Sequence, residues 1–340
     1  MFEHRGINTL CGSLKETFPD FNKQNIVLRG NLVDKTLVGY SGFVGSNLNM
    51  QTGFRNQYNS NNISEAFLTQ HDLVVYCGVR AEKFLANHEP EKDYKHVMQA
   101  VENIERMNFK KLVLISTVDV YKEIKGVDEN TYIDTDGLHP YGKHRYMLEK
   151  WVMENVSDYH ILRLPGLFGK NLKKNFIFDM INIIPSLLKE DKFLELQKLC
   201  PLNLSECYLK QENGFYKLRT LDKETRFSLK EFFRNCGFNA LSFTDSRSIF
   251  QFYNLSNLWA HIEIAIKNDI RLLCLATEPI SAGELYKRIY GKEFKNEFLS
   301  IPVRYDMHSV HYGLFNGERG YIADRGRVVA DIEKLIGETQ

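Results

Sequence analysis

Hydrophobic and polar positions divide much of this chain into alternating strand and helix patterns. Short, mostly apolar runs predict strands that are buried on both faces, at residues 36–38, 73–77, 111–116 and 160–164. Amphipathic stretches between them predict helices, most clearly at residues 92–107 and 143–156. Buried strands separated by helices predict an α/β fold with a doubly wound parallel sheet and right-handed crossovers. In such a sheet a ligand binds at the carboxyl ends of the strands.

The pattern changes after Gly169. Long helical and irregular stretches reach about Gly237 and predict a smaller C-terminal lobe. Apolar runs at residues 248–253 and 271–276 predict two further strands, each followed by a helix. The chain is therefore expected to return to the sheet before it ends in the lobe.

The sequence predicts secondary structure less clearly near the start of the chain than near its end. Residues 1–33 precede the first clear strand, and their apolar patch at 25–29 fits either an extra edge strand or an extension that covers the sheet. Near the other end, Ser281 with Glu284 three residues later is typical of a helix start, and Gly291 is typical of its end.

Composition and charge narrow the class of protein. The 340 residues are enough for one large domain or two closely packed ones, and a net charge of +1 gives no reason to expect nucleic acid or a membrane as a partner. No run approaches the roughly 18 apolar residues of a membrane span, and the first residues lack a signal-peptide profile, so a cytoplasmic location is expected. The six cysteines have no zinc-site spacing, so we expect reduced thiols and no metal.

The first predicted strand runs into a turn that contains Gly39, Gly42 and Gly45, and then into the start of a helix. A phosphate approaches a backbone closely only where side chains are missing, and the amides that open a helix favour an anion. The spacing Gly-x-x-Gly-x-x-Gly differs by one residue from the commoner dinucleotide fingerprint, although plain turn chemistry would use the same glycines. The turn indicates a dinucleotide-binding domain, which we place at residues 1–170, including the extension at 1–33. Residues 171–340 are then mainly a substrate-binding lobe, except that about 241–276 return to the sheet.

Two further sites carry candidate chemistry. Tyr141 lies at the start of a predicted helix, and Arg145 follows one turn later on the same face, where a cation would lower a phenol pKa that is normally about 10. Ser116 and Thr117 end a predicted strand, where a hydroxyl would face the ligand. A surface tyrosine and hydroxyls that only cap a strand would look the same in isolation.

The order of these three sites resembles that of the extended short-chain dehydrogenase/reductases. More narrowly, the chain resembles the NAD-dependent epimerase/dehydratase family that modifies nucleotide sugars. Residues 115–121 (ISTVDVY) resemble the family's Ser-Ser/Thr-x-x-Val-Tyr segment, and residues 163–169 (RLPGLFG) its Arg-Pro-x-x-x-x-Gly segment. The resemblance covers roughly residues 35–291, is strongest before Asn175, and implies a Rossmann sheet with a smaller C-terminal substrate lobe.

The resemblance also implies roles for particular residues. Tyr141 would be the acid/base, Thr117 with Ser116 beside it would bond the reacting sugar oxygen, and Arg145 would contact the nicotinamide ribose and lower the tyrosine pKa. The expected cofactor contacts come from the glycine turn and from later strand ends: Gly39, Gly42, Phe43, Val44, Gly45, Asn59, Ser60, Cys77, Gly78, Leu164 and Gly166. The expected substrate contacts are Arg80, Asn175 and Arg247. Weaker candidates for a substrate diphosphate are Lys170, Lys173 and Lys174, which fit solvated surface charges as well.

Three departures from the family pattern affect these expectations. Arg145 replaces the family's lysine; it keeps the charge but practically never gives up a proton, so a lysine-dependent proton relay is lost. Val118 and Asp119 stand where 4,6-dehydratases carry Asp-Glu, which removes the evident acid for dehydration. No carboxylate follows the second strand, where residues 58–62 with Arg55 nearby favour NADP over NAD.

The sequence thus predicts an NAD(P)-dependent oxidoreductase that acts on a nucleotide sugar, foremost a 4-keto sugar reductase with NADP or NAD. The stretch at residues 78–83 resembles a loop of 4-keto reductases and favours the same activity. Two alternatives stay open: a nucleotide-sugar 4-epimerase that retains NAD, and a dinucleotide-binding sensor or structural protein without catalysis, to which Arg145 points. A nucleotide sugar is the expected partner, and a homodimer is expected from the resemblance.

Overall fold

The computed structural model describes residues 27–28, 31–32 and 34–338, which belong to two compact units, 1–33 and 34–340. In the first unit, β1 (Val27–Leu28) pairs with β2 (Asn31–Leu32) as an antiparallel two-stranded sheet. The two alternatives for the patch at 25–29, an extra edge strand of the main sheet and an extension that covers it, stay predictions. The other residues of that patch lie outside the described residues.

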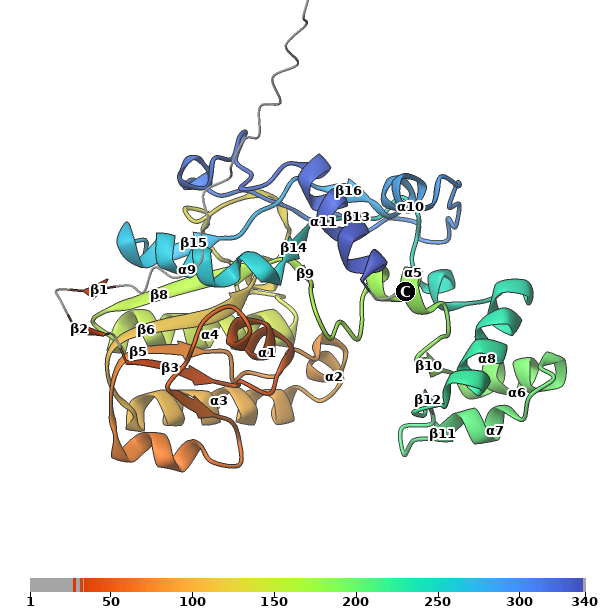
Figure 1. The fold of residues 1–340 in the computed structure, drawn as a ribbon, viewed down its shortest axis with the longest axis horizontal. Coiled ribbons are helices and arrows are strands. Elements are labelled where there is room, and N and C mark those ends of the chain that lie inside the picture. Colours follow the sequence, from red (N-terminus) through yellow and green to blue (C-terminus); the bar gives the residue numbers. More distant parts are fainter. Residues whose placement is uncertain (1–26, 29–30, 33, 339–340) are drawn as a thin grey trace, which may run out of the picture. The chain divides into compact units, whose positions relative to one another are not determined.

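The second unit is built on a parallel sheet of six strands (Figure 1). Its order is β4–β3–β5–β6–β8–β15, and every neighbouring pair is parallel. The strands are β3 (Lys35–Val38), β4 (Asn56–Tyr58), β5 (Gln70–Tyr76), β6 (Asn108–Thr117), β8 (Tyr159–Leu164) and β15 (Leu272–Cys274). Their side chains are largely buried on both faces, which is why they are continuous apolar runs. The predicted doubly wound α/β fold is confirmed.

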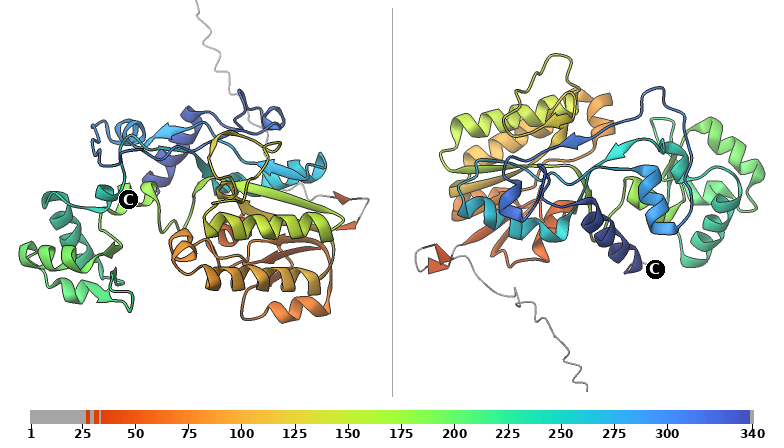
Figure 2. Two further views of the ribbon diagram at one scale, coloured as in Figure 1. Left: turned by 180° about the vertical axis from the view of Figure 1, so that it is seen from behind. Right: turned by 90° about the horizontal axis from the view of Figure 1, so that it is seen from above.

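Helices cover both faces of this sheet, as the view from above in Figure 2 shows. On one face lie α3 (Pro90–Arg106) and α4 (Pro140–Asn155), which pack against each other and share a core with β5 and β6. On the other face lie α1 (Phe43–Asn49) and α9 (Leu258–Lys267). Short elements complete the crossovers: η1 (Ile63–Leu68), α2 (Lys83–His88), η2 (Val118–Val120), β7 (Lys125–Val127) and η4 (Leu255–Asn257).

One predicted strand divides into two. Residues 248–253 form β13 (Ile249–Phe250) and the start of β14 (Phe252–Asn254). β13 pairs with β16 (Ile280–Ser281) and β14 with β9 (Gly166–Phe168), so neither joins the six-stranded sheet. Gln251 lies between them, buried, and its amide bonds the backbones of Thr277 and Met307. Of the two runs expected to return to the sheet, only 271–276 does so, as β15.

A small group of elements within the lobe has a core of its own. These are β10 (Leu187–Leu188), α6 (Glu190–Leu199), α7 (Leu204–Cys207), β11 (Tyr208–Lys210), β12 (Tyr216–Leu218) and α8 (Lys223–Asn235). Their buried side chains, among them Phe193, Tyr208 and Phe233, form a separate hydrophobic cluster. The chain enters and leaves this group side by side, since the amide of Ala240 donates to the carbonyl of Ile183 at 2.7 Å.

The remaining elements are α5 (Phe176–Asn182), η3 (Ala240–Phe243), α10 (Ala282–Tyr290), β17 (Asp306–Met307), η5 (Tyr312–Phe315) and α11 (Arg325–Gly337). The start and end predicted for α10 are confirmed: the Ser281 hydroxyl accepts from the Glu284 amide at 3.1 Å, and Gly291 follows the helix with a φ of 66°. The five described cysteines are free thiols, in line with the expected reduced state; Cys11 lies outside the described residues.

Candidate active site

The glycine turn lies at the carboxyl end of the sheet, between β3 and α1. The amide of Gly39 donates to the carbonyl of Tyr58 at the end of β4, and the amide of Cys77 after β5 donates to Val38. Gly39 has a φ of 87°, and a Cβ there would lie 2.7 Å from the Cys77 carbonyl carbon. A Cβ on Gly45 would lie 2.1 Å from the Gly39 oxygen. Both glycines are therefore required by the close packing of the turn itself.

Gly42, in the middle of the turn, is different. An added Cβ would meet only the Gly39 oxygen, at 3.3 Å, and Gly42 is exposed with an ordinary negative φ of −77°. The fold alone therefore does not demand glycine at this position. A side-chain-free, exposed backbone is what the approach of a phosphate requires, so the turn fits the pyrophosphate of a dinucleotide.

Tyr141 lies where α4 meets the segment that follows β6. His139 caps the helix by accepting from the Gly142 amide at 3.0 Å, and the Tyr141 amide donates to the Asn87 side chain. A Cβ on Gly142 would lie 2.0 Å from the Asp119 carbonyl oxygen, so glycine allows the two backbones to meet. This contact places the Tyr141 phenol near the Thr117 side chain, which lowers the pKa of the phenol.

Burial raises the pKa of the Tyr141 phenol above its ordinary value, since the residue is only 7% exposed. Arg145 acts in the opposite direction and lowers the pKa, as expected from the sequence, but it does not outweigh burial. The Asp119 carboxylate raises the pKa, and the Thr117 side chain and the charge of Lys83 lower it. In this structure Tyr141 is a protonated phenol at neutral pH.

The Arg145 guanidinium lies over the Tyr141 ring, 3.9 Å from the ring centroid. It is buried and forms an ion pair with Asp93 of α3. It also donates to the backbone carbonyls of Arg80 and, at 3.3 Å, of Tyr141. Most of the donors that were expected to contact a ribose are therefore already satisfied within the protein.

The two hydroxyls at the end of β6 face different partners. Thr117 accepts from the Asp119 amide at 3.2 Å and lies near Tyr141, whose pKa it lowers. Ser116 is buried and donates to Glu149, which forms an ion pair of 2.5 Å with Arg163 in the interior. Successive side chains in a strand point to opposite faces, which explains the separation. The expected role of Ser116 beside the substrate is not supported, because its proton is committed to this buried network.

A cluster of three residues beside Tyr141 was not visible in the sequence pattern. Lys83 of α2 forms an ion pair of 2.6 Å with Asp119, and the Tyr305 hydroxyl bonds both, at 3.1 and 3.2 Å. Asp119 was considered only as a substitute for a dehydratase residue, and nothing in the pattern around Tyr305 placed it near the site. The three residues come from segments that are adjacent only after folding.

The other expected cofactor contacts lie at the ends of strands, at the start of β9 or at the start of α1. Asn59 follows β4 and its amide group donates to Ser41 of the turn at 3.4 Å, and exposed Ser60 is the next residue. Cys77 and Gly78 end β5, Leu164 ends β8, and Gly166 begins β9. Phe43 and Val44 open α1. Arg55 was expected near this site but precedes β4 and lies 3.6 Å from Asp34, at the amino end of the sheet.

The expected substrate contacts are largely engaged inside the protein. Arg247 pairs with Asp245 at 2.7 Å and donates to the Leu299 carbonyl, so its assignment to a diphosphate is not supported. Asn175 caps α5 and donates to the Leu167 carbonyl at 2.7 Å. Arg80 is exposed, and only its backbone carbonyl contacts Arg145. Of the three weaker candidates, Lys174 donates to the Ala81 carbonyl before α2, whereas the backbone of Lys170 bonds Asn47 and Lys173 is exposed.

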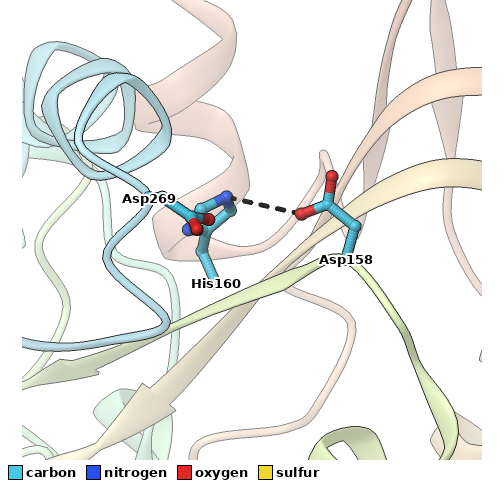
Figure 3. Close-up of side chains that lie close together, drawn as sticks. All are labelled: Asp158, His160 and Asp269. Carbon is cyan, nitrogen blue, oxygen red and sulfur yellow. Dashed lines mark ion pairs between the residues drawn. The ribbon is translucent and has the colours of Figure 1, made fainter.

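A group at the opposite edge of the sheet has the spacing of metal ligands: Asp158, His160 and Asp269 (Figure 3). Lys111 bonds Asp158 at 2.6 Å, and Arg271 lies 3.3 Å from Asp158 and 3.4 Å from Asp269. These cations already neutralise both carboxylates. The cluster therefore holds β6, β8 and the start of β15 together through ion pairs. We assign no metal ion to it.

A parallel sheet with a glycine turn after its first strand, and a tyrosine at the start of the helix that follows β6, is the arrangement expected from the resemblance to the short-chain dehydrogenase/reductases. Residues 39–201, just under half of the chain, match the model of the family described as RmlD substrate binding domain. The predicted resemblance to the extended short-chain dehydrogenase/reductases is thereby confirmed.

Solved structures share this fold along most of their length. The dTDP-4-dehydrorhamnose reductase from Bacillus anthracis str. Ames, in complex with NADP, is 16% identical, with a TM-score of 0.59 over 91% of this chain and 99% of that chain. RMD from Pseudomonas aeruginosa, complexed with NADPH, is 12% identical, with a TM-score of 0.57 over 90% and 100%. The UDP-glucose 4-epimerase from Thermotoga maritima, with UDP-glucose, is 12% identical, with a TM-score of 0.56 over 90% and 99%.

At these identities the likeness establishes the fold. A search of curated protein sequences gives no match. Among the described residues, none of the helices has both the length and the apolar character needed to cross a membrane.

Proposed function

We propose that this protein is an NADPH-dependent reductase of a nucleotide-linked 4-keto sugar. The observation that carries the proposal is the position of the buried Tyr141 phenol near Thr117 at the end of β6, at the same edge of the sheet as the glycine turn. A proton donor and an orienting hydroxyl at that edge are what carbonyl reduction requires. The fold is shared with a dTDP-4-dehydrorhamnose reductase solved with NADP and with RMD solved with NADPH.

The dinucleotide would lie on the turn formed by Gly39, Gly42 and Gly45, with Leu164 and Gly166 on the nicotinamide side. When bound, it supplies the hydride for the reduction. Asn59 and Ser60 offer uncharged hydrogen-bonding groups beside the turn and no carboxylate that would repel a 2′-phosphate, which supports NADP over NAD.

The protein's own residues then move one proton. Tyr141, kept protonated by burial, donates its phenol proton to the oxygen of the sugar carbonyl as negative charge develops there. Thr117 bonds the same oxygen and orients it. In the reverse direction the same groups act in the opposite sense, with Tyr141 accepting the proton.

Dehydration fits the site poorly. The position after Thr117 is Val118, which is 2% exposed and lies in a hydrophobic cluster, so it offers no proton to a leaving hydroxyl. The carboxylate of Asp119 is engaged with Lys83 and Tyr305. One donor, Tyr141, and one orienting hydroxyl, Thr117, are sufficient for a reduction.

The test is NADPH consumption by the purified full chain with nucleotide-linked 4-keto sugars, with dTDP-4-dehydrorhamnose as the first substrate. A reductase consumes NADPH, and the variant Tyr141→Phe loses that rate. Tightly retained NAD, together with sugar interconversion that needs no added NADPH, would instead identify a 4-epimerase. Dinucleotide binding without turnover on the whole panel would identify a sensor. The cytoplasmic location and the homodimer stay predictions.

A further inference from the structure

Asp93 is a buried carboxylate that faces the Tyr141–Arg145 pair from another helix. It lies on α3 and is 6% exposed. It contacts the Arg145 guanidinium and, at 2.8 Å, Nδ1 of His144. Both partners lie on α4, which packs beside α3. Buried carboxylates require such partners, so Asp93 is tied to the conformation of Arg145.

The contacts of Arg145 fix its guanidinium in one place. One terminal nitrogen bonds Asp93 and the Tyr141 carbonyl, and the other bonds the Arg80 carbonyl. The face of the same group lies on the Tyr141 ring at 3.9 Å. A lysine ammonium, which is a compact charge without a planar face, would not satisfy this set of contacts.

We propose that Asp93 is a positioning residue that holds Arg145 flat against the Tyr141 ring and offsets its charge, so that Tyr141 acts as a proton donor. The inference rests on the proposed reductase function. A lone cation beside a phenol favours the phenolate, whereas a cation paired with a carboxylate exerts a weaker field. The Asp93–Arg145 ion pair thus favours the protonated phenol of Tyr141 over the phenolate.

Other charged groups also face Tyr141, and the test must separate them from Asp93. Asp119 of η2, Lys83 of α2 and His139 before α4 surround the phenol, and Tyr305 joins them through Lys83. Asp119 and Lys83 neutralise each other at 2.6 Å. None of these groups contacts Asp93, so a change at Asp93 leaves their mutual arrangement intact.

The experiment is a titration of Tyr141 in the full chain after Asp93→Asn, which keeps the size and an acceptor oxygen but removes the charge. Tyrosinate absorbance is measured for each variant with and without Tyr141→Phe, so that the difference isolates Tyr141 from the other tyrosines. We expect the Tyr141 pKa to fall by on the order of one unit, the low end of the shift that a neighbouring charge produces. In the NADPH assay, the high-pH limb of kcat/KM should move down equally.

Two further variants keep the test decisive. Arg145→Gln removes the cation and should shift the Tyr141 titration in the opposite direction, which also serves if Asp93→Asn does not fold. Glu102→Gln makes the same charge change on α3 at an exposed ion pair with Arg106 and should leave Tyr141 unchanged. The proposal is overturned if Asp93→Asn leaves the titration in place or raises it, or if Arg145→Gln lowers it or leaves it unchanged. The titration needs no turnover, so it judges the ion pair even where the reductase assay fails.

Discussion

The three glycines of the turn look alike in the sequence, but the structure assigns them different tasks. Gly39→Ala places a side chain on a left-handed backbone, which costs roughly 1–2 kcal/mol. It also forces a Cβ to within 2.7 Å of the Cys77 carbonyl, and overlap of this kind costs about 1–3 kcal/mol. We therefore expect Gly39→Ala to lower the free energy of unfolding by about 3 kcal/mol. Gly45→Ala, whose Cβ would lie only 2.1 Å from the Gly39 oxygen, should lower it by at least as much.

Gly42→Ala should behave differently because its Cβ meets only one oxygen, at 3.3 Å. We expect a loss of unfolding free energy of about 1 kcal/mol or less. The added methyl group lies on the exposed backbone that a phosphate would approach, so NADPH affinity should fall at least about tenfold. Gly53→Ala is the matched control: a Cβ there meets nothing within 4 Å, and alanine should be neutral or stabilise by about 0.4–1 kcal/mol.

Denaturant unfolding and NADPH binding, followed by nucleotide fluorescence, are measured on all four variants. The assignment of Gly42 to the cofactor fails if Gly42→Ala binds NADPH like the unmodified protein. It also fails if Gly42→Ala loses as much stability as Gly39→Ala, because the turn would then need all three glycines for packing alone.

Three other changes test other parts of the structure. Tyr141→Phe should lower kcat by about 10²–10⁴ with little change in the unfolding midpoint, and an unchanged kcat would remove Tyr141 from the chemistry. Glu149→Ala leaves Arg163 buried without its carboxylate and should cost about 3–5 kcal/mol in denaturant unfolding; a cost below about 1 kcal/mol would contradict the buried network. Burial raises the pKa of Asp179 to about 7, so the folded protein retains a proton that the unfolded chain loses from its ordinary value of 3.8, and stability falls as pH rises between these values. Asp179→Asn should therefore raise the melting temperature at pH ~8 and not at pH ~3, and an equal change at both pH values would refute this reasoning.

The parts of the fold that were predicted correctly are those that local pattern determines. Buried parallel strands must be apolar along their length, so β3, β5, β6 and β8 are visible in the sequence. The break between β13 and β14 is not, because Gln251 is a polar residue whose partners, Thr277 and Met307, are far away in the chain. The separate core of the lobe is equally invisible, since its helices and strands are short and only their joint packing defines it.

The site residues that are engaged elsewhere and those that were missed have a common physical cause. A sequence pattern identifies a residue by its chemistry, but folding decides which partner satisfies it. Ser116 and Arg247 have suitable side chains at suitable positions, yet Glu149 and Asp245 already accept their hydrogen bonds. Lys83 and Tyr305 were missed for the converse reason, because only the fold brings them to Asp119.

Arg145 is a residue that the sequence predicted correctly in part, and it also has a partner that only the fold reveals. Its spacing from Tyr141 predicted a cation beside the phenol, and the guanidinium does lie on that ring. The spacing could not show that Asp93, on another helix, would share the charge. Once the donors of Arg145 are assigned to Asp93 and to two backbone carbonyls, few are free for a ribose, and the phenol keeps its proton because burial prevails. A site with one proton to give and one hydroxyl to orient a carbonyl is suited to reduction, and the burial of Tyr141 is what distinguishes it from a site built around a phenolate.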